Sequence, residues 1–191
     1  MQAVGFIECL RVNCNRPGPF IIVVPLSTIR HWQKELDERS SANTVVLHGT
    51  TEDRDTFVGS EFTELGGKSW ISHFDVMITT YETVQQELSF LKQIRWTGMV
   101  IDEAHRLKNS VTQVRSSLKD LDVDFTVLLT GTPIQNNIPE LYSLLNFMHA
   151  EEFKDREKFL AQFGTISTDE QVKGLQEILR AYNKLLYCDV M

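Results

Sequence analysis

Short apolar runs alternate with amphipathic stretches along most of this chain. The runs have the length of strands, and the run at 20–24 is a continuous series of Phe, Ile and Val. Such runs occur at residues 20–24, 44–47, 75–79, 98–101 and 125–129. Continuous apolar runs are typical of strands that are buried on both faces of a parallel sheet. Because helical patterns separate them, the chain is predicted to have an α/β fold with a parallel sheet and right-handed crossovers.

Helical spacing of apolar residues fills the intervals between the runs. Residues 1–11 are predicted to form a helix, and Ile29, Trp32 and Leu36 share one face of the next helix, which Ser27 is expected to cap. The polar, glycine-bearing stretch 51–73 predicts a short helix and a surface loop. No strand is evident in 151–191, where apolar residues keep helical spacing. We therefore expect a lobe over 1–150 and a helical appendage over 151–191.

Polar residues follow several of the predicted strands directly. Their segments are Pro25-Leu26-Ser27-Thr28, Thr79-Thr80-Tyr81-Glu82, Asp102-Glu103 and 130–137. Since parallel strands end at one edge of a sheet, these segments are expected to meet there, where α/β proteins bind ligands. Asp102 and Glu103 suit the two carboxylates of a nucleoside triphosphatase, one for Mg²⁺ and one for the attacking water. A solvated turn, or a helix N-terminus with acids that balance its dipole, would also explain the pair.

Composition narrows the class of protein. The chain has 191 residues, of which 42% are hydrophobic and 24% charged, as in an ordinary globular domain. Its formal net charge of -7 argues against binding nucleic acid through a broadly basic surface, so any such contact must be local. Cys9, Cys14 and Cys188 form neither a disulfide framework nor a zinc site, and no signal or membrane span is evident, so we expect an intracellular protein.

Four ordered segments resemble motifs Ia, Ib, II and III of SWI/SNF-type chromatin-remodelling ATPases. They are Pro25-Leu26-Ser27-Thr28 with Trp32, Thr79-Thr80-Tyr81-Glu82, the Asp-Glu-Ala-His segment 102–109, and Leu129-Thr130-Gly131-Thr132-Pro133-Ile134-Gln135-Asn136-Asn137. The first motif and the context 96–109 are most similar to the chromodomain-helicase-DNA-binding branch. DEAH-box RNA helicases share the motif II letters but have Ser-Ala-Thr at motif III, so duplex DNA is the expected substrate.

The resemblance implies the first RecA-like lobe of a nuclear, ATP-driven motor that translocates on double-stranded DNA and moves nucleosomes, with Mg²⁺ as cofactor. By this resemblance Asp102 holds Mg²⁺ through water, Glu103 orients the attacking water and His105 couples the nucleotide site to motif III. The residues implied for nucleotide contact or coupling are Thr130, Gly131, Thr132 and Gln135. Those implied for the DNA side are Pro25, Ser27, Thr28, Thr79, Thr80, Lys108, Asn136 and Asn137. About half of these are expected to touch DNA, while the others hold loop geometry.

The chain also departs from the family pattern. It contains no Gly-x-x-x-x-Gly-Lys-Ser/Thr phosphate loop, and the strand expected before that loop and the second RecA-like lobe are also absent from the sequence. Lys184-Leu185-Leu186 stands where the family has Leu-Arg-Arg, so the end from about Tyr182 is expected to be divergent, frame-altered or wrongly spliced. We therefore expect these 191 residues alone to be inactive as an ATPase. The alternative is a catalytically inactive remnant that binds DNA or nucleosomes.

Overall fold

The computed structural model describes residues 2–50, 52, 56, 60–65, 69–109, 112–131, 137–164 and 169–181. The chain divides into two compact units. The first consists of Met1–Asp102 and Val111–Thr126, and the second of Glu103–Ser110 and Val127–Met191. The domain boundary predicted at residue 150 stays a prediction.

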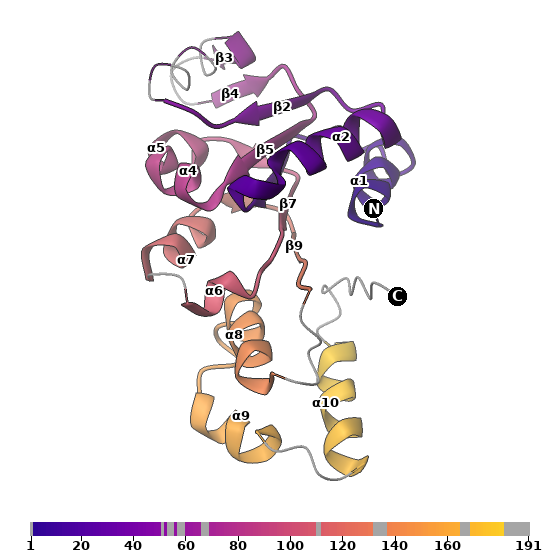
Figure 1. The fold of residues 1–191 in the computed structure, drawn as a ribbon, viewed down its shortest axis with the longest axis vertical. Coiled ribbons are helices and arrows are strands. Elements are labelled where there is room, and N and C mark those ends of the chain that lie inside the picture. The colour runs from indigo at the N-terminus through magenta and orange to yellow at the C-terminus, as the bar shows by residue number, and fades with distance from the viewer. Residues whose placement is uncertain are drawn as a thin grey trace. The chain divides into compact units, whose positions relative to one another are not determined.

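A five-stranded sheet forms the framework and confirms the predicted α/β fold (Figure 1). Its strands, in spatial order, are β2 (Thr44–Leu47), β5 (Val76–Thr80), β1 (Phe20–Val24), β7 (Gly98–Ile101) and β9 (Thr126–Leu128). The central strand β1 pairs in parallel with β5 and with β7, so that Val23 lies between Thr79 and Ile101. β2 adds a further parallel pairing to β5. The carboxyl ends of these strands therefore share one edge.

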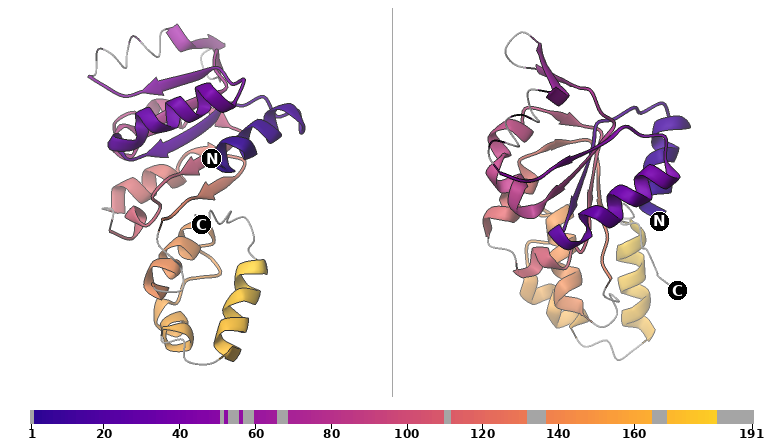
Figure 2. Two further views of the ribbon diagram at one scale, coloured as in Figure 1. Left: turned by 45° about the vertical axis from the view of Figure 1, so that its right-hand side comes forward. Right: turned by 45° about the horizontal axis from the view of Figure 1, so that its top comes forward.

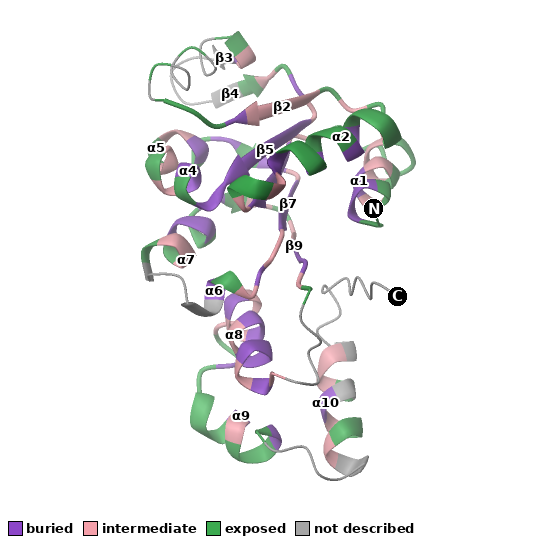
Figure 3. Ribbon diagram, in the orientation of Figure 1, coloured by how far each residue is buried: buried purple, intermediate pink, exposed green. Residues whose placement is uncertain are grey.

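Helices cover both faces of the sheet in the first unit. One face carries α1 (Gln2–Val12) and α2 (Ile29–Arg39), and the other carries α4 (Tyr81–Gln86), α5 (Leu88–Leu91) and α7 (Thr112–Lys119) (Figure 2). Every residue of β1, β5 and β7 is buried as a result (Figure 3). This double coverage explains why these strands are continuous apolar runs.

A network of polar contacts joins α1 to the chain just before β2 and β5. Arg11 binds Glu8 and Asp75 through its two terminal nitrogens, each at 2.7 Å. The amide and hydroxyl of Ser41 donate to Oε1 of Glu8 at 3.2 and 2.8 Å. Partial burial acts to raise the pKa of Glu8, but the hydrogen bonds from Ser41 and Arg11 and the positive charge of Arg11 outweigh it and lower that pKa.

Two small sheets lie beside the main one. An antiparallel hairpin joins β3 (Phe62–Leu65) to β4 (Ser69–Ser72), and a short parallel pair joins β6 (Arg95–Trp96) to β8 (Asp122–Val123). The hairpin replaces part of the loop predicted for 51–73, while the described residues 52, 56, 60 and 61 are helical as predicted. Its buried anchor is Phe62, whose ring packs edge-on against Phe74 and Phe90 at centroid distances of 5.1 and 4.9 Å. These partners are distant in sequence, so local polarity did not indicate the strands.

Apart from the end of β9, the regular structure in the described part of the second unit is helical. It contains α6 (Arg106–Asn109), α8 (Ile138–Met148), α9 (Arg156–Phe163) and α10 (Asp169–Ala181). The predicted helices after residue 151 are confirmed there, whereas the end from Tyr182 lies outside the described residues. No helix in the described part of the chain is both long and apolar enough to cross a bilayer.

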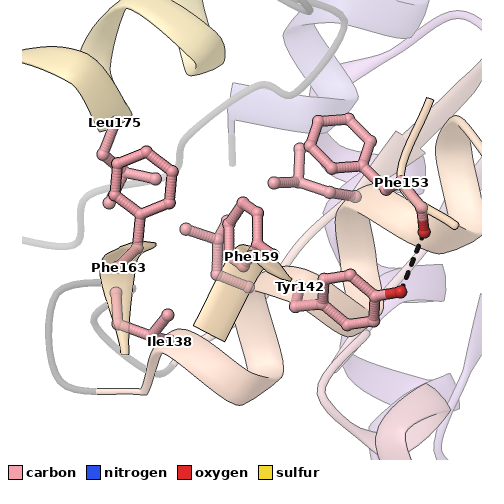
Figure 4. Close-up of a cluster of buried hydrophobic side chains, with 8 residues drawn as sticks. Ile138, Tyr142, Phe153, Phe159, Phe163 and Leu175 are labelled. Carbon is pink, nitrogen blue, oxygen red and sulfur yellow. Dashed lines mark hydrogen bonds between the residues drawn. The ribbon is translucent and has the colours of Figure 1, made fainter. Parts of the chain in front are cut away.

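Aromatic side chains build the core of the second unit. Phe159 of α9 packs against Tyr142, Phe153 and Phe163, and Leu175 of α10 completes the cluster (Figure 4). The hydroxyl of Tyr142 donates to the carbonyl oxygen of Phe153 at 2.8 Å. The core role predicted for Phe159 and Phe163 is confirmed. An aromatic core of this kind needs no cofactor to explain it.

Candidate functional site

Asp102 is the residue that directly follows β7, and it is held by three bonds within the first unit. Its amide donates to the carbonyl of Val23 at 2.9 Å, which continues the pairing of β7 with β1. The hydroxyl of Tyr81 donates to its carbonyl oxygen at 2.5 Å. The indole Nε1 of Trp32 donates to carboxylate Oδ2 at 2.8 Å. Backbone and carboxylate are therefore both fixed at the edge of the sheet.

The two side chains that hold Asp102 come from opposite faces of the sheet. Trp32 lies on α2, which follows β1, and Tyr81 opens α4, which follows β5. Both are buried, at 7% and 4% exposure, so the core fixes their positions. Neither was assigned a role from the sequence. Their residue types could have indicated such a role, because a buried indole N–H or phenol O–H usually has a polar partner.

Glu103 lies in the second unit and has an unusual backbone conformation. Its φ is 52°, in the left-handed region that residues other than glycine rarely adopt. The turn is closed by the amide of Arg106, which donates to the carbonyl of Glu103 at 2.9 Å, and by the amide of Ala104, which donates to Leu129 at 2.8 Å. Backbone strain of this kind is concentrated at functional sites, where the surrounding structure maintains it.

His105 and Gly131 lie next to the Glu103 carboxylate. Nδ1 of His105 is 3.1 Å from Oε2 of Glu103, close enough for an ion pair but not aligned as a hydrogen bond. A side chain on Gly131 would begin 3.8 and 3.9 Å from the two carboxylate oxygens. The backbone of motif III thus approaches Glu103 closely where it has no side chain. Motifs II and III meet at this point within the second unit.

The described ends of the 130–137 segment are bonded to one helix. The hydroxyl of Thr130 donates to Oε1 of Glu140 at 3.3 Å. Asn137 caps α8, with Oδ1 accepting from the amide of Glu140 at 3.2 Å and Nδ2 donating to Oε2 at 2.8 Å. Three predicted site residues, Thr132, Gln135 and Asn136, lie outside the described residues.

The motif Ia residues form a turn before α2. Leu26–Thr28 is a 3₁₀ turn, and the hydroxyl of Thr28 donates to the carbonyl of Pro25 at 2.9 Å. Ser27 is exposed, but it does not cap the helix as predicted, since Thr28 takes the N-cap position and no side chain bonds there. Because of the 3₁₀ turn, the N-cap of α2 lies one residue later than predicted. This leaves the hydroxyl of Ser27 on an exposed residue.

The motif Ib threonines are buried. Thr79 has no exposed surface, and its hydroxyl donates to the carbonyl of Leu47 at 2.9 Å. Thr80 caps α4 by accepting from the amide of Thr83 at 3.1 Å, and it bonds the Thr83 hydroxyl at 3.0 Å. Both hydroxyls are thus used within the protein. The side chain of Lys108, another predicted DNA contact, lies outside the described part of the chain.

The chemistry of the carboxylates fits a magnesium-dependent site. Mg²⁺ prefers oxygen ligands, keeps several waters and is usually held by one or two carboxylates together with phosphates. Asp102 and Glu103 are half-buried acids of this kind. Among the described residues, no group of three or more His, Cys, Asp or Glu could hold a metal ion. Two carboxylates are donors of the type that Mg²⁺ accepts.

Comparisons with known proteins are consistent with one another. A model of the SNF2-related domain matches residues 1–188. Chromodomain-helicase-DNA-binding protein 8 of Xenopus tropicalis is 39% identical over 184 residues, which cover 94% of this chain and 8% of that protein. Chromodomain-helicase-DNA-binding protein 6 of Rattus norvegicus is 42% identical over 184 residues, which cover 94% of this chain and 7% of that protein. The chain thus spans less than a tenth of the length of these curated relatives.

A solved structure has a similar fold. The Sulfolobus solfataricus SWI2/SNF2 ATPase core in complex with dsDNA superposes with a TM-score of 0.73 at 25% identity. The match covers 97% of this chain and 36% of that chain.

Proposed function

Because the chain belongs to the SNF2-related domain family, we propose that it is the first lobe of an ATP-dependent translocase that acts on double-stranded DNA in chromatin remodelling. Two relatives are named as chromodomain-helicase-DNA-binding proteins, and a solved relative is described in complex with dsDNA. Nucleosomes as substrate, a second RecA-like lobe as partner and a nuclear location are parts of the same proposal. The observation that carries it is the anchoring of Asp102 at the end of β7 by Trp32 and Tyr81.

The two carboxylates of motif II have separate proposed tasks. Asp102 holds Mg²⁺ through the water shell of the ion, and Glu103 orients the water that attacks the terminal phosphate of ATP. When bound, Mg²⁺ supplies positive charge that neutralises the phosphates. The bond from Trp32 supports the first task, because it fixes the rotamer of the Asp102 carboxylate. Its rigid support reduces the reorganisation needed during reaction.

Coupling to DNA is proposed to run through the contacts of Glu103. His105 and Gly131 lie beside its carboxylate, and Gly131 belongs to the motif III segment together with Thr130, Thr132 and Gln135. A segment that touches the hydrolytic carboxylate can respond to a change in phosphate occupancy. The proximity of Gly131 to Glu103 supports this route.

The DNA side is proposed to consist of exposed polar groups and backbone amides. Ser27 is the exposed candidate, whereas the hydroxyl of Thr28 and the side chain of Asn137 also bond Pro25 and Glu140. Contacts by Pro25, Lys108 and Asn136 stay predictions from the resemblance. Thr79 and Thr80 are reassigned to holding the loop, because their hydroxyls bond Leu47 and Thr83. With a net charge of -7, contacts to phosphates must be few and local.

A second candidate function is a binding module without hydrolysis. The 191 residues contain no Gly-x-x-x-x-Gly-Lys-Ser/Thr segment, whose backbone amides and lysine cradle the β and γ phosphates in nucleoside triphosphatases. We expect the 191-residue chain alone to bind duplex DNA without hydrolysing ATP. Phosphate release with and without duplex DNA tests this. DNA-stimulated release that Glu103→Gln abolishes would contradict it.

Glu103→Gln in an extended protein separates the two candidates. The extension adds a Gly-Lys-Thr phosphate loop before residue 1 and a second lobe after residue 181, both from another member of the family. We expect DNA-stimulated hydrolysis that falls by about 10²-fold or more in Glu103→Gln, because an activating base is lost, with ATP affinity nearly unchanged. Glu38→Gln, which alters an exposed carboxylate on α2, is the matched control.

Each outcome of this experiment has one meaning. Equal loss of ATP binding and hydrolysis in Glu103→Gln would refute the role assigned to Glu103. An extended protein that binds duplex DNA and ATP but never hydrolyses ATP would favour the binding module. An extended protein without any affinity for duplex DNA would refute both functions.

A further inference from the structure

Helix α2 reaches from the exposed motif Ia turn to the Asp102 carboxylate. It begins directly after the 3₁₀ turn Leu26–Thr28, in which Ser27 is exposed. Four residues after the N-cap, Trp32 donates from Nε1 to Oδ2 of Asp102 at 2.8 Å. A helix rises about 1.5 Å per residue, so the N-cap and Trp32 are separated by about 6 Å along the axis. All of these residues belong to the first unit.

The start of α2 is suited to contact with a phosphate group. The N-cap residue Thr28 does not cap the helix with its side chain, and the first turn contains no acidic residue. Arg30 is exposed in that turn. The positive end of the helix dipole and an arginine both favour a phosphate. On a chain with a formal net charge of -7, this is therefore a local place where contact with DNA is favourable.

The start of α4 differs, although Tyr81 also holds Asp102. The hydroxyl of Tyr81 bonds the backbone carbonyl of Asp102 and not its carboxylate. Thr80, which caps α4, is 1% exposed. Glu82 is the exposed residue in the first turn of α4, and its negative charge repels a phosphate. Trp32, and not Tyr81, therefore lies on a helix whose start favours contact with DNA.

We propose that Trp32 is a positioning residue that transmits contact between duplex DNA and the start of α2 to the carboxylate of Asp102. The indole is 7% exposed, and close packing makes it move with its helix. Because hydrogen bonds depend steeply on geometry, a small displacement of the donor changes the orientation of the carboxylate. This inference rests on the proposed function for its DNA contact. It differs from the route proposed through Glu103, since it lies within the first unit.

The consequence concerns the Mg²⁺ that Asp102 is proposed to hold. Coupling between two sites is reciprocal, so DNA contact and ion binding change the affinity of each other by the same factor. Asp102 is half-buried, which places the contribution of Trp32 at the lower end of the usual range, about five- to tenfold.

The first test reads the Asp102 carboxylate directly in the full 191-residue chain. The carboxyl carbons of aspartate are labelled with ¹³C, and the Asp102 resonance is assigned through its loss in Asp102→Asn. A short labelled duplex DNA is added, and fluorescence anisotropy gives the bound fraction. We expect the Asp102 resonance to move as the duplex binds. The resonance of Asp75, which accepts from Arg11 and from the amide of Asn43, should stay in place.

Two variants isolate the contribution of Trp32. Trp32→Phe keeps an aromatic ring but cannot donate a hydrogen bond, so the response of Asp102 should be lost at equal DNA occupancy. Tyr81→Phe is the matched control, because it also removes one hydrogen bond to Asp102. It should leave the response in place, since α4 does not begin at a surface that favours phosphate.

The second test measures coupling in the extended protein that carries a phosphate loop and a second lobe. The Kd for duplex DNA is measured with and without Mg²⁺ and a non-hydrolysable ATP analogue, and the ratio of the two values is the coupling factor. Trp32→Phe should bring this factor about fivefold closer to one, whereas Tyr81→Phe should change it by less than about twofold. A merely structural weakening of the DNA surface would alter both Kd values alike and leave the factor unchanged.

The outcomes separate this inference from the proposed function. A response of Asp102 that survives in Trp32→Phe, or that Tyr81→Phe removes to the same extent, would overturn the inference. An unchanged coupling factor in Trp32→Phe would also overturn it. Binding of duplex without any response of Asp102 would refute the inference alone. Absence of duplex binding in both proteins would refute the proposed function and this inference with it.

A variant that fails to fold, or a short chain that fails to bind, still leaves a decisive measurement. If Trp32→Phe does not fold, the wild type is labelled with a fluorinated tryptophan, and its resonances are assigned with Trp70→Phe and Trp96→Phe. The Trp32 resonance must then move on binding of duplex while that of Trp96, which donates to Leu91, stays in place. If the extended protein binds duplex and the 191-residue chain does not, the coupling factor decides.

Discussion

Trp32→Phe tests whether the indole N–H holds the Asp102 carboxylate. Phenylalanine keeps an aromatic ring at this buried position but cannot donate to Oδ2, which lies 2.8 Å from Nε1. A hydrogen bond to a charged group contributes about 1.5–3 kcal/mol, and the half-exposure of Asp102 favours the lower end, about 1.5 kcal/mol. The smaller ring also leaves a cavity, with a further cost of about 1 kcal/mol or more. The single variant therefore cannot isolate the bond.

A double-mutant cycle separates the bond from the cavity. The free energy of unfolding is measured in urea for the wild type, Trp32→Phe, Asp102→Ala and the double variant. Trp32→Phe leaves the same cavity whether residue 102 is Asp or Ala, so the cost of the cavity cancels in the cycle. We therefore expect a coupling energy of about 1–1.5 kcal/mol, which reports the hydrogen bond. Because the chain has two compact units, the unfolding transition of the first unit must be resolved by a local probe.

Trp96 provides the matched control for this cycle. It is fully buried, and its Nε1 donates to the carbonyl of Leu91 at 3.0 Å, so Trp96→Phe loses the same group from a different contact. Trp96→Phe and Asp102→Ala should add to within about 0.5 kcal/mol. A coupling energy for Trp32 no larger than that for Trp96 would refute the view that Trp32 fixes Asp102.

Two further predictions concern stability. Gly98→Ala should destabilise the chain by about 1–3 kcal/mol in urea unfolding, because a Cβ there would lie 2.3 Å from Cζ of Phe125. Gly5→Ala, where a Cβ would have nothing within 4 Å, should be neutral or stabilising. Equal effects of the two substitutions would contradict the packing argument. The pKa of Glu8 is lowered in the folded protein, so its contribution is present above the ordinary glutamate pKa of 4.5 and is lost as pH falls through the folded value. Stability measured from pH 6 downward should therefore fall less steeply in Glu8→Gln than in the wild type, and parallel curves would contradict this sign.

The framework of the fold was predictable because the strands are buried on both faces. The runs at 20–24, 44–47 and 98–101 coincide with β1, β2 and β7, and the runs at 75–79 and 125–129 agree within one residue with β5 and β9. The hairpin β3–β4 escaped prediction since its anchor, Phe62, packs on Phe74 and Phe90, far along the chain. The expected cap at Ser27 was wrong by one residue, because a 3₁₀ turn precedes α2. The local pattern of apolar residues predicts which segments are buried. It does not predict contacts between segments that are distant in the sequence.

The family was also predictable, because four ordered motifs are specific as a set. The match to the SNF2-related domain and the chromodomain-helicase-DNA-binding relatives confirm that resemblance. The supports of Asp102 were not predictable in the same way. Trp32 and Tyr81 belong to motifs Ia and Ib, but their bonds to Asp102 depend on the lateral order β5, β1, β7, which brings α2 and α4 to the end of one strand.

Position relative to the last residue of a strand explains which polar side chains in motifs Ia and Ib turn inward. Thr79 and Thr80 are the final residues of β5, an inner strand between β2 and β1, so backbone groups of Leu47 and of α4 lie within reach of their hydroxyls. Ser27 comes after the end of β1, in a turn whose carbonyl is already satisfied by Thr28, and it remains exposed. The hydroxyls of the last two residues of β5 are therefore used within the fold, whereas Ser27, beyond the end of β1, is exposed and can meet a ligand. We therefore expect Ser27→Ala to weaken duplex binding, measured by anisotropy, more than Thr79→Val does. Thr79→Val should lower the free energy of unfolding in urea more than Ser27→Ala does. The reverse order in the two assays would show that position relative to the strand end does not decide the role of these hydroxyls.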